Sequence, residues 1–268
     1  MTVGPLVIAA GLLLFGQVDA GSSFWTAVLP AGIVLGLGLF GSRQFTGANL
    51  TTLAVYAGLG AATFLVVLQL QVVLGYSPVE AGASLLPLTV LMLLLSSHFG
   101  ALSQRVGPRL PMTVGPLVIA VGLLLFGQVD AGSSFWTSVL PAGIVLGLGL
   151  SITVAPLTST VLGAVDEEHL GIASGVNNAV ARLAGLLAVA VLPGVVGLDL
   201  ASTQEEFSEG FGTGMVVAAC LCLVGGLVAF LTVRSARPTD GDPRPLEQPC
   251  LDPSRLRPAS AGAGSSGT

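Results

Sequence analysis

The stretch LPAGIVLGLGLSITVAPLTSTVLGAV, residues 140–165, carries no charged side chain. An apolar run of this length is long enough to cross a hydrocarbon layer of about 30 Å as a helix. Small residues recur in it at every fourth position, and Pro156 follows one of them: Gly143, Gly147, Ser151, Ala155, Ser159 and Gly163. Residues four apart share one helix face, so a neighbouring backbone can approach closely. We expect a membrane helix that packs through this face.

The same apolar character extends over most of the chain. Of 268 residues, 53% are hydrophobic and 9% are charged, and the mean hydropathy is +0.91, whereas soluble domains carry about 25% charged residues. In lipid the backbone must satisfy its own hydrogen bonds, which favours helices. The sequence therefore predicts an all-α, polytopic membrane helix bundle. We expect about eight transmembrane helices, at residues 2–17, 24–40, 47–74, 79–99, 112–129, 135–163, 170–198 and 212–233.

Residues 1–39 are a near copy of residues 112–150. The two segments differ at two positions, Ala10/Val121 and Ala27/Ser138. Such fidelity indicates a recent rearrangement of one gene, and Met1 corresponds to the interior Met112, so we expect the chain to be a piece of a larger protein. The copy meets bulky Phe40 where the complete helix continues with small residues. We therefore expect a duplicated two-helix segment over 1–39 that docks peripherally.

Charge sets the expected orientation. Arg43, Arg105 and Arg109, and Arg234 fall on one side of an alternating path through the membrane. Basic loops face the cytoplasm, so both termini are expected there. Residues 235–268 are rich in Pro, Ser, Gly and Arg without periodicity and are expected to form a disordered cytoplasmic tail. The loop at 199–211 is expected on the outer side.

Composition also argues against several function classes. All nine basic residues are Arg and form no basic patch, which gives no reason to expect nucleic-acid binding. No His or Cys cluster has metal-ligand spacing, so neither a metal site nor a cofactor is expected. We also find no triad or paired-carboxylate pattern in the apolar segments, and we do not expect an enzyme.

A Gly- and Arg-containing motif joins two of the apolar segments. It reads GALSQRVGPRLP, residues 100–111, with Gly100, Arg105, Gly107 and Arg109 as its candidate residues. The two glycines permit a tight cytoplasmic turn, and the arginines can bond helix carbonyls or acids of an adjoining domain. The alternative is a plain turn whose charges only orient the chain.

This motif resembles the cytoplasmic signature G-x-L-A-D-R-x-G-R-R of the major facilitator superfamily, with Gln104 where the signature has Asp. The segments SRQFTGANL, LGYSPVEAGASLLPLTVL, GLGLSITVAPLTSTVLGAV and GIASGVNNAVARLAG resemble the C-terminal half of its fourteen-helix drug:proton antiporters. The resemblance implies a six-helix C-terminal half over 40–234 and a missing N-terminal half. It further implies efflux of hydrophobic or cationic drug-like molecules from bacteria, in exchange for protons, by alternating access across the cell membrane.

Four polar residues are candidates for the substrate path: Tyr56, Asn177, Asn178 and Arg182. Asn178 and Arg182 share a polar face with glycines of the 170–198 segment, and an Arg in mid-membrane is costly unless it has a partner or a wet cavity. The alternatives are an Arg182 that snorkels to the inner interface and a Tyr56 that only packs. Gln69 and Gln71 are expected to be solvated at the outer interface.

Apart from Glu80, at the outer start of the 79–99 span, no Asp or Glu lies inside the predicted spans. Proton coupling generally needs a titratable group within the membrane, so we expect this chain to depend on a group supplied elsewhere. The competing hypothesis is a non-transporting membrane scaffold or regulatory half-transporter that pairs with a full-length relative.

Overall fold

The computed structural model describes residues 29–197 and 204–234. Every regular element within them is helical, and six helical segments are long and apolar enough to cross a membrane. Of the expected eight spans, the segment at 2–17 and the start of the one at 24–40 lie outside the described residues. The elements in chain order are α2 (Leu29–Leu39), α3 (Arg43–Val72), α4 (Pro78–Ala83), α5 (Leu86–Val106), α6 (Arg109–Phe126), the π-helix η2 (Phe135–Val139), α7 (Leu140–Leu162), the 3-10 turn η3 (Glu167–His169), α8 (Leu170–Val195) and α9 (Gln204–Thr232).

Local sequence explains where several of these helices begin and bend. The Ser42 hydroxyl accepts a hydrogen bond from the Phe45 amide and caps α3, and Ser77 and Glu80 form a reciprocal capping box at α4. Proline lacks an amide hydrogen and its ring clashes with the carbonyl four residues earlier. Accordingly, the helix is interrupted before Pro87, and a π-helix precedes Pro141.

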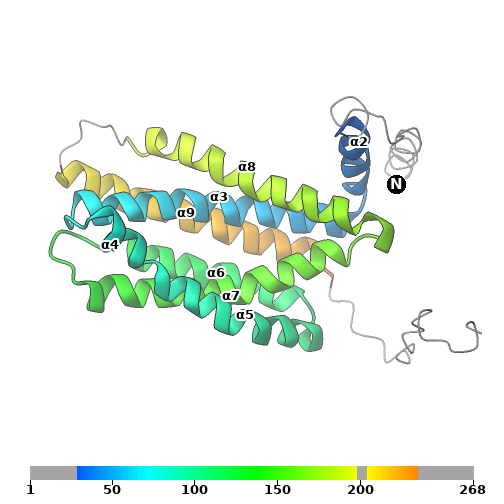
Figure 1. Ribbon diagram of the computed structural model, residues 1–268, viewed down its shortest axis with the longest axis horizontal. Helices are drawn as coiled ribbons and strands as arrows, with labels where there is room; N and C mark the ends of the chain where they lie inside the picture. Colours follow the sequence, from blue (N-terminus) through cyan, green and yellow to red (C-terminus); the bar gives the residue numbers. More distant parts are fainter. Residues whose placement is uncertain (1–28, 198–203, 235–268) are drawn as a thin grey trace, which may run out of the picture. The chain divides into compact units, whose positions relative to one another are not determined.

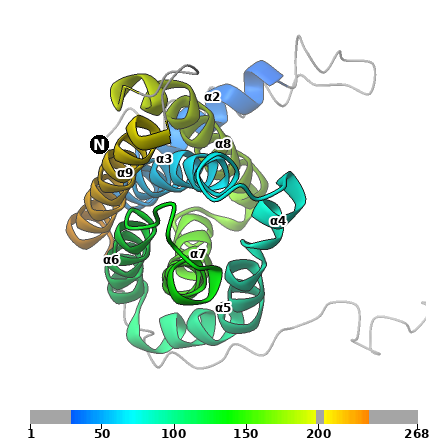
Figure 2. The same ribbon diagram turned by 90° about the vertical axis from the view of Figure 1, so that its left-hand side faces the viewer.

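The six spanning segments form an incomplete ring (Figures 1 and 2). α5 packs on α7, α7 on α6, α6 on α9, α9 on α3 and α3 on α8. α5 and α8 stand at the two ends of this series, and each has one extensive neighbour. The bundle is therefore open between α5 and α8.

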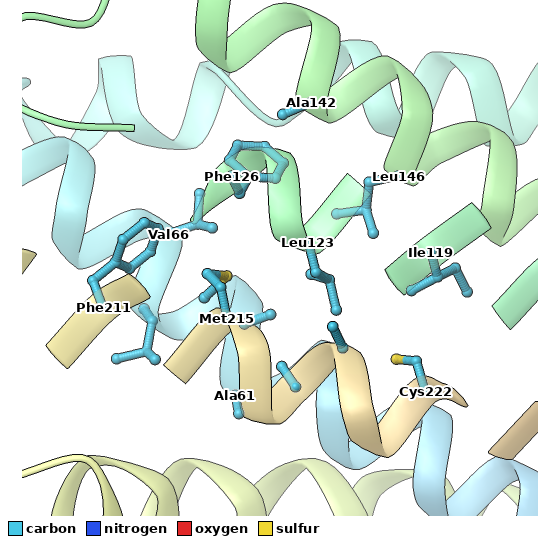
Figure 3. Packing of buried hydrophobic residues seen from close by; sticks show 14 of the residues in the cluster. Ala61, Val66, Ile119, Leu123, Phe126, Ala142, Leu146, Phe211, Met215 and Cys222 are labelled. Carbon is cyan, nitrogen blue, oxygen red and sulfur yellow. The ribbon is translucent and has the colours of Figure 1, made fainter. Parts of the chain in front are cut away.

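The interior of the ring is a hydrophobic cluster contributed by α3, α6, α7 and α9 (Figure 3). Leu123 and Phe126 of α6 and Met215 of α9 lie at its centre, each no more than 1% exposed. Glycines let these helices approach closely: a Cβ on Gly122 would lie 2.7 Å from the Leu146 amide nitrogen, and one on Gly149 would lie 2.6 Å from that of Ile119. The close packing of α6 on α7 thus depends on residues without side chains.

α2 repeats the sequence of the first turns of α7 and buries the same face against a different partner. Leu35 and Leu39 are 2% and 5% exposed, and their counterparts Leu146 and Leu150 are 5% and 8% exposed. A Cβ on Gly36 would lie 2.9 Å from Val176 of α8. The equivalent atom on Gly147 would lie 3.0 Å from the Leu88 Cα of α5.

Two predicted boundaries were wrong. α5 continues to Val106, so Gly100 and Arg105 are helical and the turn contracts to Gly107 and Pro108. α9 begins at Gln204 inside the predicted loop 199–211. The apolar content of a segment predicts only the part of a helix that is buried in the membrane, because helical turns that extend into water can be polar.

The boundary of α9 also corrects the placement of acidic residues. Glu205, Glu206 and Glu209 belong to α9 and not to a loop. All three are exposed, and Glu209 lies about 8 Å along the axis from Gln204 at 1.5 Å per residue. Within the described residues the acids thus remain near helix ends.

Candidate transport groove

A cavity of about 870 Å³ opens between α5 and α8 and is floored by α3 and α7. We call it the central groove. Its wall is mostly apolar, with Leu59 and Phe64 from α3, Met92 from α5, Leu146 and Leu150 from α7 and Leu186 from α8. A volume of about 300–1,000 Å³ is typical of pockets for drug-sized molecules. The open side of the ring therefore offers an apolar groove of the size that such a molecule needs.

Two of the substrate-path candidates line this groove. Tyr56 comes from the middle of α3 and is partly buried, and Arg182 comes from the middle of α8 and is exposed. Thr63 and Thr89 also line it, but their hydroxyls lie within hydrogen-bond distance of the carbonyls of their own helices. Tyr56 and Arg182 are therefore the lining residues whose polar groups remain available for hydrogen bonds to a ligand.

The crossing of α3 and α8 brings these two residues to one end of the groove. A Cβ on Gly60 would lie 2.6 Å from the Gly185 Cα, so the two backbones touch one turn from Tyr56 and Arg182. Interhelical hydrogen bonding supports the crossing, because the Thr52 hydroxyl donates to Asn177 Oδ1 at 2.8 Å. Asn177 is thus engaged between helices, and Asn178 is exposed on α8 outside the groove lining.

The residues of the 100–111 motif have separate environments. Gly107 has φ 85°, a left-handed conformation that favours glycine, and it makes the turn between α5 and α6. The Arg109 guanidinium lies 4.3 Å from the centroid of the Phe230 ring and links α6 to α9. Arg105 is exposed in the last turn of α5, where a cation is favoured by the helix dipole. Gly100 packs near Ala155 of α7.

The small-residue face of α7 contacts α5. Beyond the Gly147 approach to Leu88, the Ser151 hydroxyl lies 3.4 Å from the Leu91 carbonyl and 2.8 Å from the Gly147 carbonyl. A Cβ on Gly143 would instead lie 3.9 Å from the Phe126 ring. Pro156 is buried within α7. This face determines how closely α5, one wall of the groove, approaches α7, which forms part of its floor.

One polar residue was misjudged from the sequence. Gln69 is 1% exposed, and its Nε2 donates to the Val129 carbonyl at 2.7 Å and lies 3.4 Å from Ser208 Oγ. Interfacial solvation was the wrong expectation, because the side chain is enclosed by α3, α9 and the segment after α6. Its position in the series Ala62, Val66, Gln69 follows the buried face of α3, which was the available signal.

The described part of the chain contains no group of three or more His, Cys, Asp or Glu residues that could hold a metal ion. Cys220 is exposed and Cys222 is buried, and both are free thiols of α9. The size and the apolar lining of the central groove suit the binding of a small molecule.

The fold by itself defines a class of protein. Six apolar helices long enough to span a membrane, arranged around a lateral groove, make this a multi-pass membrane protein. The family model of the Major Facilitator Superfamily matches residues 1–189 and again residues 48–264. The chain belongs to the Major Facilitator Superfamily, as its resemblance to that family predicted.

The curated relatives are named as resistance or transport proteins. The chain is 30% identical over 249 residues to the lincomycin resistance protein of Streptomyces lincolnensis, covering 91% of this chain and 49% of that protein. It is 28% identical to a probable actinorhodin transporter of Streptomyces coelicolor, covering 85% and 41%, and 25% identical to the multidrug resistance protein Stp of Mycobacterium tuberculosis, covering 76% and 41%. The chain thus spans about half the length of these relatives or less.

Proposed function

We propose that this chain supplies one six-helix half of a drug exporter and that the central groove forms one wall of its substrate path. The observation that carries the proposal is the open side of the ring between α5 and α8, which exposes an apolar groove of about 870 Å³. Relatives named for drug resistance and export are about twice as long, which supports a second half that faces this groove.

In this proposal transport proceeds by alternating access. Two halves rock about a site near the middle of the membrane, and the groove opens to each side in turn. Tyr56 and Arg182 contribute the polar groups of this wall, and Asn177 supports the crossing of α3 and α8. The orientation with both termini in the cytoplasm of a bacterial cell belongs to the same proposal.

Proton coupling then depends on the other half. Among the described residues, Glu167 and Glu168 precede α8, and the acids of α9 lie near its beginning. All of them are exposed, and the Glu80 carboxylate accepts a hydrogen bond from Ser77 at the start of α4. A coupling group must exchange protons within the membrane. We therefore assign the coupling carboxylate to the partner half and the apolar wall with Arg182 to this chain.

Transport in inverted membrane vesicles tests the proposal. The chain is expressed alone, and together with the N-terminal half of the lincomycin resistance protein, and accumulation of a fluorescent hydrophobic dye is followed after energisation. We expect accumulation only from the pair, and we expect a protonophore to abolish it.

Two outcomes count against the proposal. Proton-driven accumulation by the purified chain alone in liposomes would show that no second half is needed. Stable co-purification of the two halves without dye accumulation would favour the alternative, a non-transporting scaffold that pairs with a relative.

A further inference from the structure

We propose that the central groove selects amphipathic compounds that carry a negative charge, with Arg182 binding the anionic group and the apolar walls holding the rest of the molecule. This inference rests on the proposed function, because it names the substrate class of the same groove. It departs from the hydrophobic or cationic compounds that the family resemblance implies.

The charge of the groove carries the argument. Among the described residues that line it, Arg182 is the one charged side chain, and none is Asp or Glu. Glu167 and Glu168 belong to η3, directly before α8, and precede Arg182 by about 20 Å or more along the chain axis. Across the groove, Glu80 precedes α5, and its carboxylate accepts hydrogen bonds from Ser77. Glu80 does not line the groove, so no carboxylate among the described residues of this chain compensates Arg182 there.

The position of Arg182 makes a role in the groove more favourable than escape to water. It lies near the midpoint of α8, about 18 Å from Leu170 and about 20 Å from Val195 along the axis. The distance that the side chain must reach to snorkel to either interface is therefore greatest at this point. A cation held in an apolar wall exerts a strong field, because the surroundings screen it weakly. An anionic ligand would relieve the cost of placing the guanidinium there.

The shape of the site suits an anion with an apolar body. The glycine pair Gly60 and Gly185 keeps side chains away from the helix crossing next to Arg182. The planar guanidinium presents several donors in a fork that matches a carboxylate, sulfonate or phosphate. Tyr56, from the facing helix α3, adds an aromatic ring and one hydroxyl donor to the lining. The walls beyond them are made of the leucines, Phe64 and Met92 named above.

Two probes of the same size and opposite charge test the inference. Tetraphenylborate and tetraphenylphosphonium are equilibrated with the purified chain in lipid nanodiscs, and empty nanodiscs correct for partition into lipid. We expect the chain to bind the borate about tenfold or more tightly than the phosphonium after this correction. This ratio requires no variant, so it is measurable even if a substitution prevents folding.

Variants then locate the preference at Arg182. We expect Arg182→Gln to remove it and Arg182→Lys to retain its sign, because lysine keeps the positive charge. Arg105→Gln is the matched control, since it removes the same charge from the end of α5, outside the groove lining. It is expected to leave the ratio unchanged.

The inference is overturned if the parent chain binds the phosphonium as well as the borate, or if Arg182→Gln behaves like Arg105→Gln. The vesicle assay separates this failure from that of the proposed function. If the preference for the anionic probe depends on Arg182 but the paired halves do not transport, the anion site is retained and the transport role is rejected. Transport by the pair without any sign preference rejects the anion site alone.

Discussion

Gln69 shows how a single buried amide ties together elements that are distant in sequence. Its side chain belongs to α3 and is shielded from solvent, and it donates a hydrogen bond to the Val129 carbonyl, which follows α6. Removing the donor from a buried carbonyl costs more free energy than removing it from an exposed carbonyl, because no water replaces the lost hydrogen bond. The C-terminal end of α3 is therefore held by a polar contact within an otherwise apolar interface.

Replacing this amide tests its contribution. Gln69→Leu keeps the volume of the side chain but leaves the Val129 carbonyl without its donor, and we expect the free energy of unfolding to fall by about 1 kcal/mol. Chemical unfolding in mixed micelles, followed by circular dichroism, measures the change. Gln71→Leu is the control, because Gln71 Nε2 bonds the Val67 carbonyl of its own helix at 3.3 Å. Equal losses in the two variants would contradict the assignment.

At the scale of elements, the α3–α8 crossing decides where the polar end of the groove forms. The two glycines at this crossing are not equivalent. A Cβ on Gly60 would meet the Gly185 backbone at 2.6 Å, whereas a Cβ on Gly185 would have its nearest neighbours at 3.9 Å. One position has no room for a methyl group, and the other has ordinary van der Waals space.

This asymmetry predicts opposite outcomes for the same substitution. We expect Gly60→Ala to lower the free energy of unfolding by about 1–3 kcal/mol, because the helices must move apart. Gly185→Ala is expected to be neutral or to stabilise by up to about 1 kcal/mol through its helix propensity. Unfolding of both variants under identical detergent conditions gives the comparison. A larger loss in Gly185→Ala than in Gly60→Ala would show that the crossing has a different geometry.

At the scale of the whole bundle, the six spanning segments pack on one another without requiring α2. The side chain nearest to Gly36 of α2 belongs to Val176 of α8, which does not line the groove. Lipid tails solvate an apolar helix face about as well as another apolar helix does. Losing a helix that docks on this side should therefore cost little.

Truncation tests whether the duplicated segment is peripheral. A chain that begins at Phe40, with an added start methionine, is expected to unfold cooperatively and to lose no more than about 1 kcal/mol of stability. Circular dichroism and gel filtration in detergent provide the measurement. A chain that ends at Gly197 lacks α9, which packs on both α3 and α6, and we expect it not to fold. Loss of cooperative unfolding on removal of residues 1–39 would mean that the segment is integral to the bundle.

The fold class could be predicted from the sequence, because long apolar segments with few charged residues are what a helix needs to lie in a lipid bilayer. The spans of α3, α6, α7 and α8 were found to within a few residues. The start of α9 and the end of α5 were not, because the first turns of α9 and the last turn of α5 are polar and carry no apolar signal. Arg182 could be singled out from its cost alone, whereas the groove that it faces could not.

The repeated segment separates what the sequence determined from what tertiary structure decided. The face with Leu35, Gly36 and Leu39 in α2, and with Leu146, Gly147 and Leu150 in α7, is buried in both copies, because helical periodicity places the same small and apolar residues together. The partner differs: α8 contacts one copy, whereas α5 and α6 contact the other. A helix face specifies how closely another helix can approach, but which helix arrives depends on the connections and packing of the entire bundle.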